Sequence, residues 1–539
     1  ARRWLEVFGA DRFAIEVTNH LEEGDALRTG RLNEIAKALG VRTAATNNVH
    51  YTTQKDGALH DVLDCIRRIV PLSAVTAPRK NHEYWLKPPE EMARLHDEES
   101  IDNAAWVAKQ CRYELPLGEF HFPDPIKTPS ILGGDKAPAG AHPSEILAAR
   151  CREGVARRFG APAAEVLGRL DYELKMIRAM GFCGFFLLVA GIVDHIKKNM
   201  GIRCACRGSA AGSLVAYVLG ISEVDPVAHD LVFERFMNPY RKEIPDIDID
   251  VESARREEVN NYILKAFPKL SAMVGMMETF QARAAIREAG KALGITQSEI
   301  DLISKAFPHI SARNIPAALE SLPEVAGLNL TASKLEVLFD LASRLDRFPR
   351  HLAMHPSGVI LSDNNLADLM PMQLSNEGFL TSQFDKDDVE TLGLAKLDVL
   401  GVRMLSAITH TLGEIQRVRG RSVELESIDT HDEVTFDLIR ESRTLGCFQI
   451  ESPGQRELLG KFQPGRFEDL IIDISLFRPG PMKADMVRPF LSRRMQLDPV
   501  SYGHSSMAYF LKETHGVIVY HEQVMRVIAS LTGCSLSEA

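Results

Sequence analysis

Residues Pro245 to Asp250 alternate aspartate with isoleucine in the order Pro-Asp-Ile-Asp-Ile-Asp. Isoleucine favours strands and aspartate disfavours them, so the alternation predicts a strand with one apolar face and one acidic face. The two isoleucines are expected in a hydrophobic core, and Asp246, Asp248 and Asp250 on the opposite face. Carboxylates this close repel one another unless a cation lies between them, and their oxygens suit Mg²⁺. The alternative is a solvated acidic edge strand that resists aggregation.

A second acidic candidate is Asp398, which interrupts an apolar run from Leu392 to Leu400. Burying an unpaired carboxylate is costly, and a metal ion or a partner cation would remove that cost. Joined to Asp248 and Asp250, this carboxylate would complete a site for two metal ions roughly 3.5–4 Å apart, which suits in-line phosphoryl or nucleotidyl transfer. The alternative is a salt bridge, for example to Lys396.

Small residues form a loop from Arg207 to Ser213, ahead of an expected helix from Leu214 to Leu219. Such a loop lets the backbone approach a ligand, and the N–H groups at a helix start bind phosphate. The loop lacks the Gly-Lys-Ser/Thr ending of a Walker A motif. Its place shortly before the aspartate strand favours phosphates at the loop and metal at the strand, with an ordinary turn and helix cap as the alternative.

Basic residues recur every four positions, at Arg283, Arg287 and Lys291, on a helix expected to begin at Thr279. They would form one face that can follow a phosphate backbone. Glu288 dilutes this face, so a solvated helix surface is the alternative. Further along, the stiff turn from Phe477 to Lys483 carries two more cations.

Composition bounds the class of protein. The chain has 539 residues, 45% hydrophobic and 25% charged, with a net charge of −10 (63 basic minus 73 acidic residues). This is a composition typical of a multidomain globular protein, and a small basic nucleic-acid binder is disfavoured, although a large enzyme with a local basic channel is not. Eight cysteines are too few for a disulfide framework and favour a reducing cytoplasm. Cys204 and Cys206 are interpreted as two small semi-buried residues rather than a metal pair.

The secondary-structure pattern changes along the chain. The first 75 residues alternate strand and helix, residues 143–180 and 254–345 are expected to be helical, residues 350–400 to form short strands, and residues beyond 404 to be helical with breaks at prolines. A polar, proline-rich stretch from Pro116 to Pro143 predicts a linker or long loop. No run of about 18 apolar residues is present, so no membrane span is expected. The patterned ends of the chain suggest a piece of a longer protein.

Seven motifs, taken in order, resemble those of the alpha subunit of bacterial DNA polymerase III, the C family of DNA polymerases. Seven motifs in the family's order are far more specific than any one of them. They are Arg207 to Ser213, Pro245 to Asp250, Gln383 to Lys386, Leu394 to Gly401, Phe448 to Ser452, Phe477 to Pro481 and Tyr520 to Met525.

The resemblance implies a multidomain α/β fold. Residues 1–80 would be the C-terminal part of a PHP domain, residues 81–279 and 351–403 a polymerase-beta-like palm, residues 280–350 a helical thumb, and residues 404–539 helical fingers. In the PHP fold a late Asp-x-His pair binds metal. Here Asn48 replaces the acidic ligand, so His50 is interpreted as a satisfied polar residue.

The resemblance also implies site roles for a template-directed DNA polymerase that uses two Mg²⁺ ions and deoxynucleoside triphosphates. The thumb helix with Arg283, Arg287 and Lys291 would contact primer–template DNA. Asp248, Asp250 and Asp398 would be the catalytic metal ligands, with Asp246 a neighbour, and the nucleotide would contact Arg207, Gly208, Ser209, Ser213, Lys396 and Arg478.

Partners and subtype follow from the same resemblance. A sliding clamp and other replisome or mutasome subunits would bind through regions beyond residue 539, and the protein would work at the nucleoid in the bacterial cytoplasm, without a membrane. Cys206 stands where the family usually has glycine and Val251 where it commonly has phenylalanine, and the segments Gly446 to Phe448 and Glu451 to Gln455 favour the error-prone branch over the replicative one. Two other classes remain open on the residues alone, a metal-dependent nuclease or phosphotransferase and a non-catalytic nucleic-acid scaffold.

Overall fold

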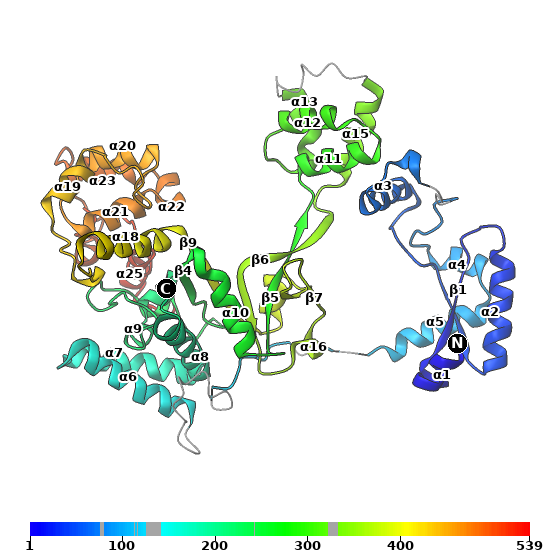
Figure 1. Ribbon diagram of the computed structural model, residues 1–539, viewed down its shortest axis with the longest axis horizontal. Coiled ribbons are helices and arrows are strands. Elements are labelled where there is room, and N and C mark those ends of the chain that lie inside the picture. Colours follow the sequence, from blue (N-terminus) through cyan, green and yellow to red (C-terminus); the bar gives the residue numbers. More distant parts are fainter. Residues whose placement is uncertain (76–79, 113, 116, 126–141, 242, 322–331) are drawn as a thin grey trace. The chain divides into compact units, whose positions relative to one another are not determined.

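The computed structural model describes residues 1–75, 80–112, 114–115, 117–125, 142–241, 243–321 and 332–539. The chain divides into two compact units, residues 1–116 with 277–353, and residues 117–276 with 354–539 (Figure 1). Most of the linker expected between Pro116 and Pro143 lies outside the described residues.

An α/β motif opens the first unit, as the sequence predicts. Strands β1 (Ala14–Thr18) and β2 (Arg42–Thr46) pair in parallel, which requires a crossover, and α2 (Asp25–Leu39) supplies it. Helix α5 (Glu98–Gln110) packs against β2. Two shorter helices, α1 (Arg2–Phe8) and α4 (Pro89–Leu95), complete this part.

A helical cluster forms the rest of the first unit. Helix α3 (Gly57–Arg68) shares a hydrophobic core with residues from 280 onward, in which Leu59 and Val62 pack with Ile286 and Leu338. The other helices of the cluster are α11 (Ala282–Ala292), α12 (Gln297–Ala306), α13 (Ile315–Ser321) and α15 (Ala332–Arg344).

The second unit is built on a seven-stranded mixed sheet. Its order is β3-β4-β9-β6-β5-β8-β7, and β4 pairs in parallel with β9 but antiparallel with β3. The strands are β3 (Cys204–Arg207), β4 (Asp248–Glu252), β5 (Ser271–Thr279), β6 (Pro349–Leu361), β7 (Met372–Leu374), β8 (Leu380–Ser382) and β9 (Ala395–Val402).

Strand β5 corrects the expectation that residues 254–345 are helical throughout. Its first five residues are buried in succession, and a strand covered on both faces shows no alternating pattern. Gly275 lies so close to a neighbouring strand that an added Cβ would stand 2.3 Å from the Ser382 carbonyl oxygen. Because β5 runs to Thr279, the basic helix begins at Ala282 and not at Thr279.

Five helices pack with the β3-β4-β9 end of the sheet in one hydrophobic core. Every residue of α8 except the last is buried, and Ile247 and Ile249 join this core at 0% and 1% exposure. The expected alternation of the acidic strand is therefore confirmed. The five helices are α6 (Pro143–Phe159), α7 (Ala164–Ala179), α8 (Cys183–Asp194), α9 (Leu214–Val218) and α10 (Arg256–Ala266).

Helices dominate beyond residue 402, as expected. Pro453 and Pro479 stand at the start of helices, where their missing N–H groups have no intrahelical acceptor to lose. The helices are α18 (Arg403–Arg419), α19 (Glu433–Arg440), α20 (Pro453–Phe462), α21 (Phe467–Leu476), α22 (Pro479–Lys483), α23 (Val487–Arg494), α24 (Ala508–Leu511) and α25 (His521–Thr532).

Among the described residues, no single helix has both the length and the apolar character that crossing a membrane demands. Helix α7 and the helical stretch Cys183–Asn199, bent by 111° where they meet, satisfy both criteria only as a pair.

Candidate functional site

Three carboxylates meet at the edge of the sheet where β4 and β9 run side by side. Asp248 on β4 lies opposite Asp398 on β9, and Asp246 comes just before β4. One oxygen from each of the three lies within 4.8 Å of the others, a spacing that can hold a metal ion. Asp398 is buried, Asp248 is half-buried and Asp246 is exposed. The predicted meeting of Asp248 with Asp398 is thus present in the structure.

Asp250 lies outside this group. Its carboxylate accepts an ion pair from Arg207 on β3, whose Nε is 3.2 Å from Asp250 Oδ1 and 4.0 Å from Asp248 Oδ2. The three aspartates of the alternating segment therefore divide, with Asp246 beside the β9 carboxylate and Asp250 beside a guanidinium. The role of Asp250 as a catalytic ligand stays a prediction.

Two side chains hold Asp398 in place. Lys396 Nζ lies 2.5 Å from Asp398 Oδ2, and Ser357 Oγ donates to Asp398 Oδ1 at 3.0 Å. The Ser357 turn is itself held by His355, whose Nδ1 accepts from the Gly358 N–H at 2.9 Å. Asp398 therefore forms the expected salt bridge with Lys396 and also belongs to the group of three aspartates. Sequence reasoning missed Ser357 and His355, because nothing local shows that β6 lies next to β9.

The three carboxylates Asp246, Asp248 and Asp398 repel one another. Burial, and then the nearby charges of Asp246 and Asp398, raise the pKa of Asp248 to about 6, although Arg207 and Lys396 oppose the shift. Burial lowers the pKa of Lys396, but its hydrogen bond to Asp398 and the surrounding carboxylates leave that pKa raised overall. Hard oxygen donors in a mutually repelling set fit a divalent cation such as Mg²⁺, which would relieve the repulsion.

A cavity of about 390 Å³ opens beside Asp246. Its walls carry the cations Arg241, Lys386 and Lys396 and the hydroxyl of Ser209, and they also carry three carboxylates, those of Glu243, Asp246 and Glu390. Anionic oxygens are the natural ligands of the three cations. The sequence predicted nucleotide contacts for Lys396 and Ser209 but not for Arg241, and it indicated Lys386 only as the last residue of a family motif. The remaining lining residues are Phe120, Ile244, Pro245 and Leu394.

The small-residue loop contributes less to phosphate binding than its pattern suggests. Gly208 adopts φ +78°, a left-handed conformation that favours glycine, and places Ser209 at the cavity. Ser213 is fully buried, and its hydroxyl donates to Glu173 at 2.9 Å. Glu173 also accepts from the Leu214 and Val215 N–H groups, each at 3.0 Å. A protein carboxylate therefore already occupies the start of α9, which matches the turn-and-cap alternative for Ser213.

The two cysteines beside the site are buried in β3. Burial raises the pKa of Cys204 to about 11 and that of Cys206 to about 12. Neither cysteine belongs to a group of three potential metal ligands among the described residues.

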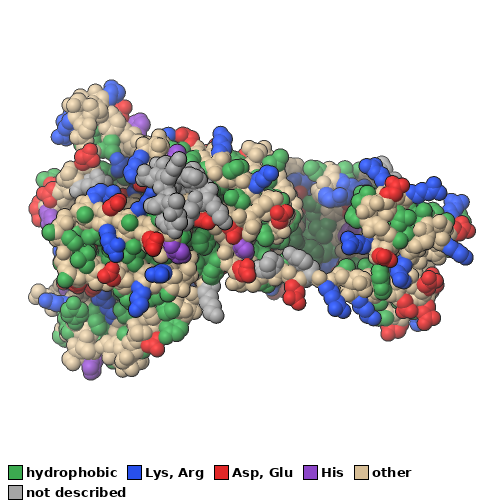
Figure 2. Space-filling view, turned by 90° about the horizontal axis from the view of Figure 1, so that it is seen from below, with side chains coloured by type: hydrophobic (Ala, Val, Ile, Leu, Met, Phe, Trp, Pro, Cys, Tyr) green, Lys and Arg blue, Asp and Glu red, His purple; other side chains and the backbone are tan. Residues whose placement is uncertain are grey.

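The predicted cations outside the sheet lie elsewhere. Arg478 is exposed at the start of α22 and does not line the cavity. On α11, Arg283 Nε donates to the Phe307 carbonyl at 2.6 Å, Arg287 pairs with Asp301 at 3.5 Å, and Lys291 pairs with Glu288 at 3.5 Å. On the face drawn in Figure 2, basic and acidic side chains are interspersed.

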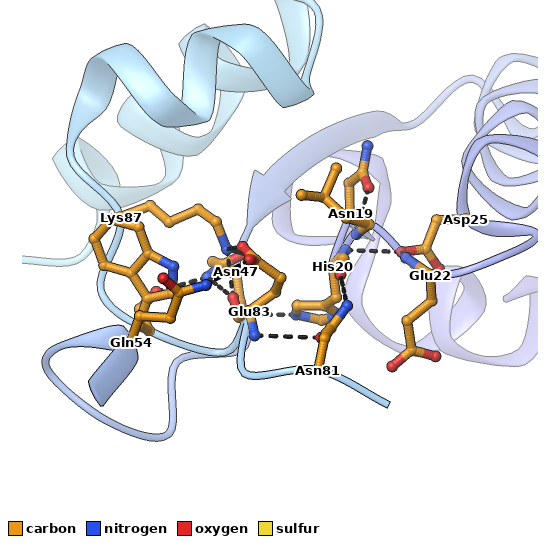
Figure 3. A network of polar contacts seen from close by, with 11 residues as sticks. Asn19, His20, Glu22, Asp25, Asn47, Gln54, Asn81, Glu83 and Lys87 are labelled. Carbon is orange, nitrogen blue, oxygen red and sulfur yellow. Dashed lines mark hydrogen bonds and ion pairs between the residues drawn. The ribbon is translucent and has the colours of Figure 1, made fainter. Parts of the chain in front are cut away.

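A buried polar network occupies the N-terminal α/β motif (Figure 3). The Lys87 ammonium contacts the Glu83 carboxylate at 3.0 Å and Asn47 Oδ1 at 3.2 Å, and His20 Nε2 lies 2.9 Å from the Asn47 carbonyl oxygen. His50 lies edge-on to His60, with ring centroids 5.0 Å apart. Within the described ranges, the only group of three or more potential metal ligands is the aspartate group on the sheet.

Known proteins match along the whole chain. Residues 145–401 match the bacterial DNA polymerase III alpha NTPase domain, and residues 404–539 match the bacterial DNA polymerase III alpha subunit finger domain. An error-prone DNA polymerase of Symbiobacterium thermophilum is 36% identical over 100% of this chain and 49% of its own length. The DNA polymerase III subunit alpha of Bacillus subtilis is 35% identical over 96% of this chain and 46% of its own length. The chain spans about half the length of these relatives, and it belongs to the bacterial DNA polymerase III alpha subunit family.

Proposed function

We propose that this chain carries the active site of a template-directed DNA polymerase, which adds deoxynucleotides to a primer 3′ end. The observation that carries the proposal is the carboxylate group Asp246, Asp248 and Asp398 beside a cation-lined cavity. Relatives named as DNA polymerases match the whole chain and support the same conclusion.

The three carboxylates Asp246, Asp248 and Asp398 would hold the divalent ions. Bound there, Mg²⁺ ions would activate the primer 3′-hydroxyl and stabilise charge on the triphosphate and the leaving pyrophosphate. Ser357 and Lys396 fix the orientation of Asp398, so that its oxygens are positioned before ligands arrive. We favour Asp246 over Asp250 as the third ligand, because Asp246 offers an oxygen within 4.8 Å of those of Asp248 and Asp398, whereas Asp250 lies outside this group.

The cavity would receive the triphosphate. Arg241, Lys386 and Lys396 supply charge for its oxygens, and Ser209 supplies a hydroxyl donor. Arg207 and Gly208 would shape the loop that presents Ser209. Because Glu173 occupies the start of α9, the phosphates would be bound by these side chains and not by that helix.

The domain assignment remains part of the proposal. The strands β3, β4 and β9 would belong to a palm of residues 81–279 and 351–403, the helices of residues 280–350 would be a thumb on primer–template DNA, and residues 1–80 would be the end of a PHP domain. Relatives named error-prone DNA polymerase and DNA polymerase III subunit alpha both match the chain. We favour an error-prone role on the sequence of Gly446 to Phe448 and Glu451 to Gln455.

Single-nucleotide primer extension with Mg²⁺ tests the proposal on the full-length natural protein. The parent should extend a primer by the templated nucleotide, Asp248→Ala should not, and Asp368→Asn, an exposed acid on α16 (Leu366–Leu369), should behave as the parent. Extension that survives in Asp248→Ala would refute the metal site. Primer shortening without extension would favour the second candidate, a metal-dependent nuclease, which the same carboxylates also suit.

A further inference from the structure

The motif Tyr520 to Met525 has no role in the site described so far. It forms the start of α25 in the finger domain, and its Gln523 is buried at 5% exposure. All hydrogen-bonding capacity of the Gln523 amide is used. Oε1 accepts from the Val519 and Tyr520 N–H groups at 2.7 and 3.0 Å, while Nε2 donates to the Phe510 carbonyl and Thr514 Oγ1 at 3.1 and 2.9 Å. The helix start is therefore rigidly fixed within the finger domain.

Two ion pairs join this fixed helix to a segment that leads into β4. Glu522 Oε1 lies 2.7 Å from Arg235 Nη1. One turn along α25, Arg526 forms an ion pair with the Asp230 carboxylate and donates to the Asp230 carbonyl oxygen at 2.9 Å. Glu522 and Arg526 are 15% and 21% exposed, whereas their partners Arg235 and Asp230 are 38% and 71% exposed, so each pair has one shielded and one more solvated end.

The same segment continues into the wall of the nucleotide cavity. Phe236 and Met237 anchor it in the core at 4% and 2% exposure. Asn238 lines a smaller cavity of about 70 Å³ together with Arg241 and Asp246, and its Nδ2 donates to the Ser537 carbonyl oxygen at 2.9 Å. The finger domain thus holds this segment just before Arg241, a cation proposed to bind the triphosphate, and Asp246, a carboxylate proposed to bind metal.

We propose that the pairs Glu522–Arg235 and Arg526–Asp230 form a latch that positions the cavity wall, and that Glu522 and Arg526 are positioning residues for the incoming nucleotide. The inference rests on the proposed polymerase function. Neither side chain lines the cavity, so each acts through Arg235 or Asp230 on the position of Arg241 and Asp246. Loss of the latch should weaken nucleotide binding more than it slows the chemical step.

The test compares Glu522→Gln and Arg526→Gln with Arg526→Lys, which retains the charge that faces Asp230. The matched control is Glu513→Gln, because Glu513 pairs with Arg466 at 2.6 Å within the finger domain and touches no part of the latch. Steady-state primer extension gives kcat and KM for the nucleotide in the full-length protein. Equilibrium binding of Mg²⁺–dATP to the enzyme with a primer–template whose primer ends in a 3′-dideoxynucleotide gives Kd without catalysis, and melting curves report folding.

We expect each glutamine variant to raise KM and Kd about three- to fivefold with kcat within about twofold, Arg526→Lys to recover at least half of the effect, and Glu513→Gln to match the parent. Unchanged KM and Kd in both glutamine variants would overturn the latch, as would a fall in kcat alone or an equal effect in Glu513→Gln. If one glutamine variant does not fold, the other decides by the same criteria. A parent that binds nucleotide but does not extend would refute the proposed function, while Kd would still decide the latch.

Discussion

Asp248 and Asp398 lie opposite each other on the parallel strands β4 and β9, although 150 residues separate them in the chain (398 minus 248). Gly358 of β6 pairs with Asp398 from the other side, and Arg207 of β3 pairs with Asp248. One row across four strands therefore places a guanidinium, two carboxylates and a glycine side by side. The acidic centre is a product of strand register.

The first prediction separates the three aspartates of the alternating segment. Asp246→Asn should lower nucleotide incorporation by about 100-fold or more, because it removes a carboxylate from the metal-binding group. Asp250→Asn should cost about tenfold or less, since Asp250 lies outside the group of three carboxylates and pairs with Arg207. Single-turnover extension measures both. A larger loss in Asp250→Asn would restore Asp250 as the ligand and make Asp246 the neighbour.

Asp398→Asn provides a companion to that comparison. It should abolish incorporation while leaving the affinity for primer–template DNA within about twofold, because Asp398 is buried and bound to Lys396 and Ser357. Fluorescence anisotropy with labelled DNA measures the affinity. Incorporation equal to that of the parent would show that Asp398 holds no catalytic ion.

The second prediction concerns pH and the buried Asp473 of α21. Burial raises its pKa to about 7, and Gln455 Nε2 donates to its Oδ2 at 2.7 Å, while Oδ1 has no hydrogen-bond partner in the described part of the chain. Between about pH 4 and 7 the folded state holds this proton and the unfolded state has released it, so the group makes stability fall as pH rises. Asp473→Asn should therefore raise the unfolding free energy at both pH values, and by about 2 kcal/mol more at pH 8 than at pH 5.

Urea unfolding at the two pH values, monitored by far-UV circular dichroism, tests this expectation. Asp368→Asn is the control, because Asp368 is exposed on α16 and its charge should not favour either state. A variant that is less stable than the parent at pH 8 would mean that the ionised carboxylate has a stabilising partner.

The third prediction concerns the polar network of the N-terminal α/β motif. Lys87→Met should reduce the unfolding free energy by about 3 kcal/mol, because it leaves the Glu83 carboxylate and Asn47 Oδ1 without the buried ammonium. Lys461→Met is the matched control, since Lys461 also pairs with a glutamate four residues earlier, Glu457, but both side chains of that pair are exposed. It should cost less than about 0.5 kcal/mol. Equal losses in the two variants would show that burial does not strengthen the Lys87 contacts.

The fourth prediction decides between the two interpretations of the basic face on α11. If Arg287 and Lys291 contact DNA phosphates, replacing both with glutamine should lower the slope of log Kd against log salt by about 2. Their ion pairs with Asp301 and Glu288 are long and exposed, so they can be exchanged for phosphate. Titrations of primer–template DNA at four salt concentrations measure the slope. An unchanged slope would identify the face as a solvated helix surface.

Local pattern was sufficient for several elements. The alternation from Pro245 to Asp250 predicted a strand with buried isoleucines, and the structure has both. The helical character expected over residues 143–180 is present as α6 and α7. Both predictions succeed because the buried face of a half-buried strand or helix gives its sequence a regular spacing of apolar residues. Strand β5 was missed because a strand buried on both faces has no such period.

Seven ordered motifs in the sequence alone identified the family, and composition and alternation alone predicted an acidic strand with an apolar back. Which carboxylates lie close together was decided only by tertiary structure. Asp246, Asp248 and Asp250 have the same period, but β3 brings Arg207 to Asp250 and β9 brings Asp398 to Asp248. In the same way, α7 brings Glu173 to the start of α9 and takes the place a phosphate would need. Period reports which face a side chain occupies, whereas its neighbour across that face is set by pairing between distant segments.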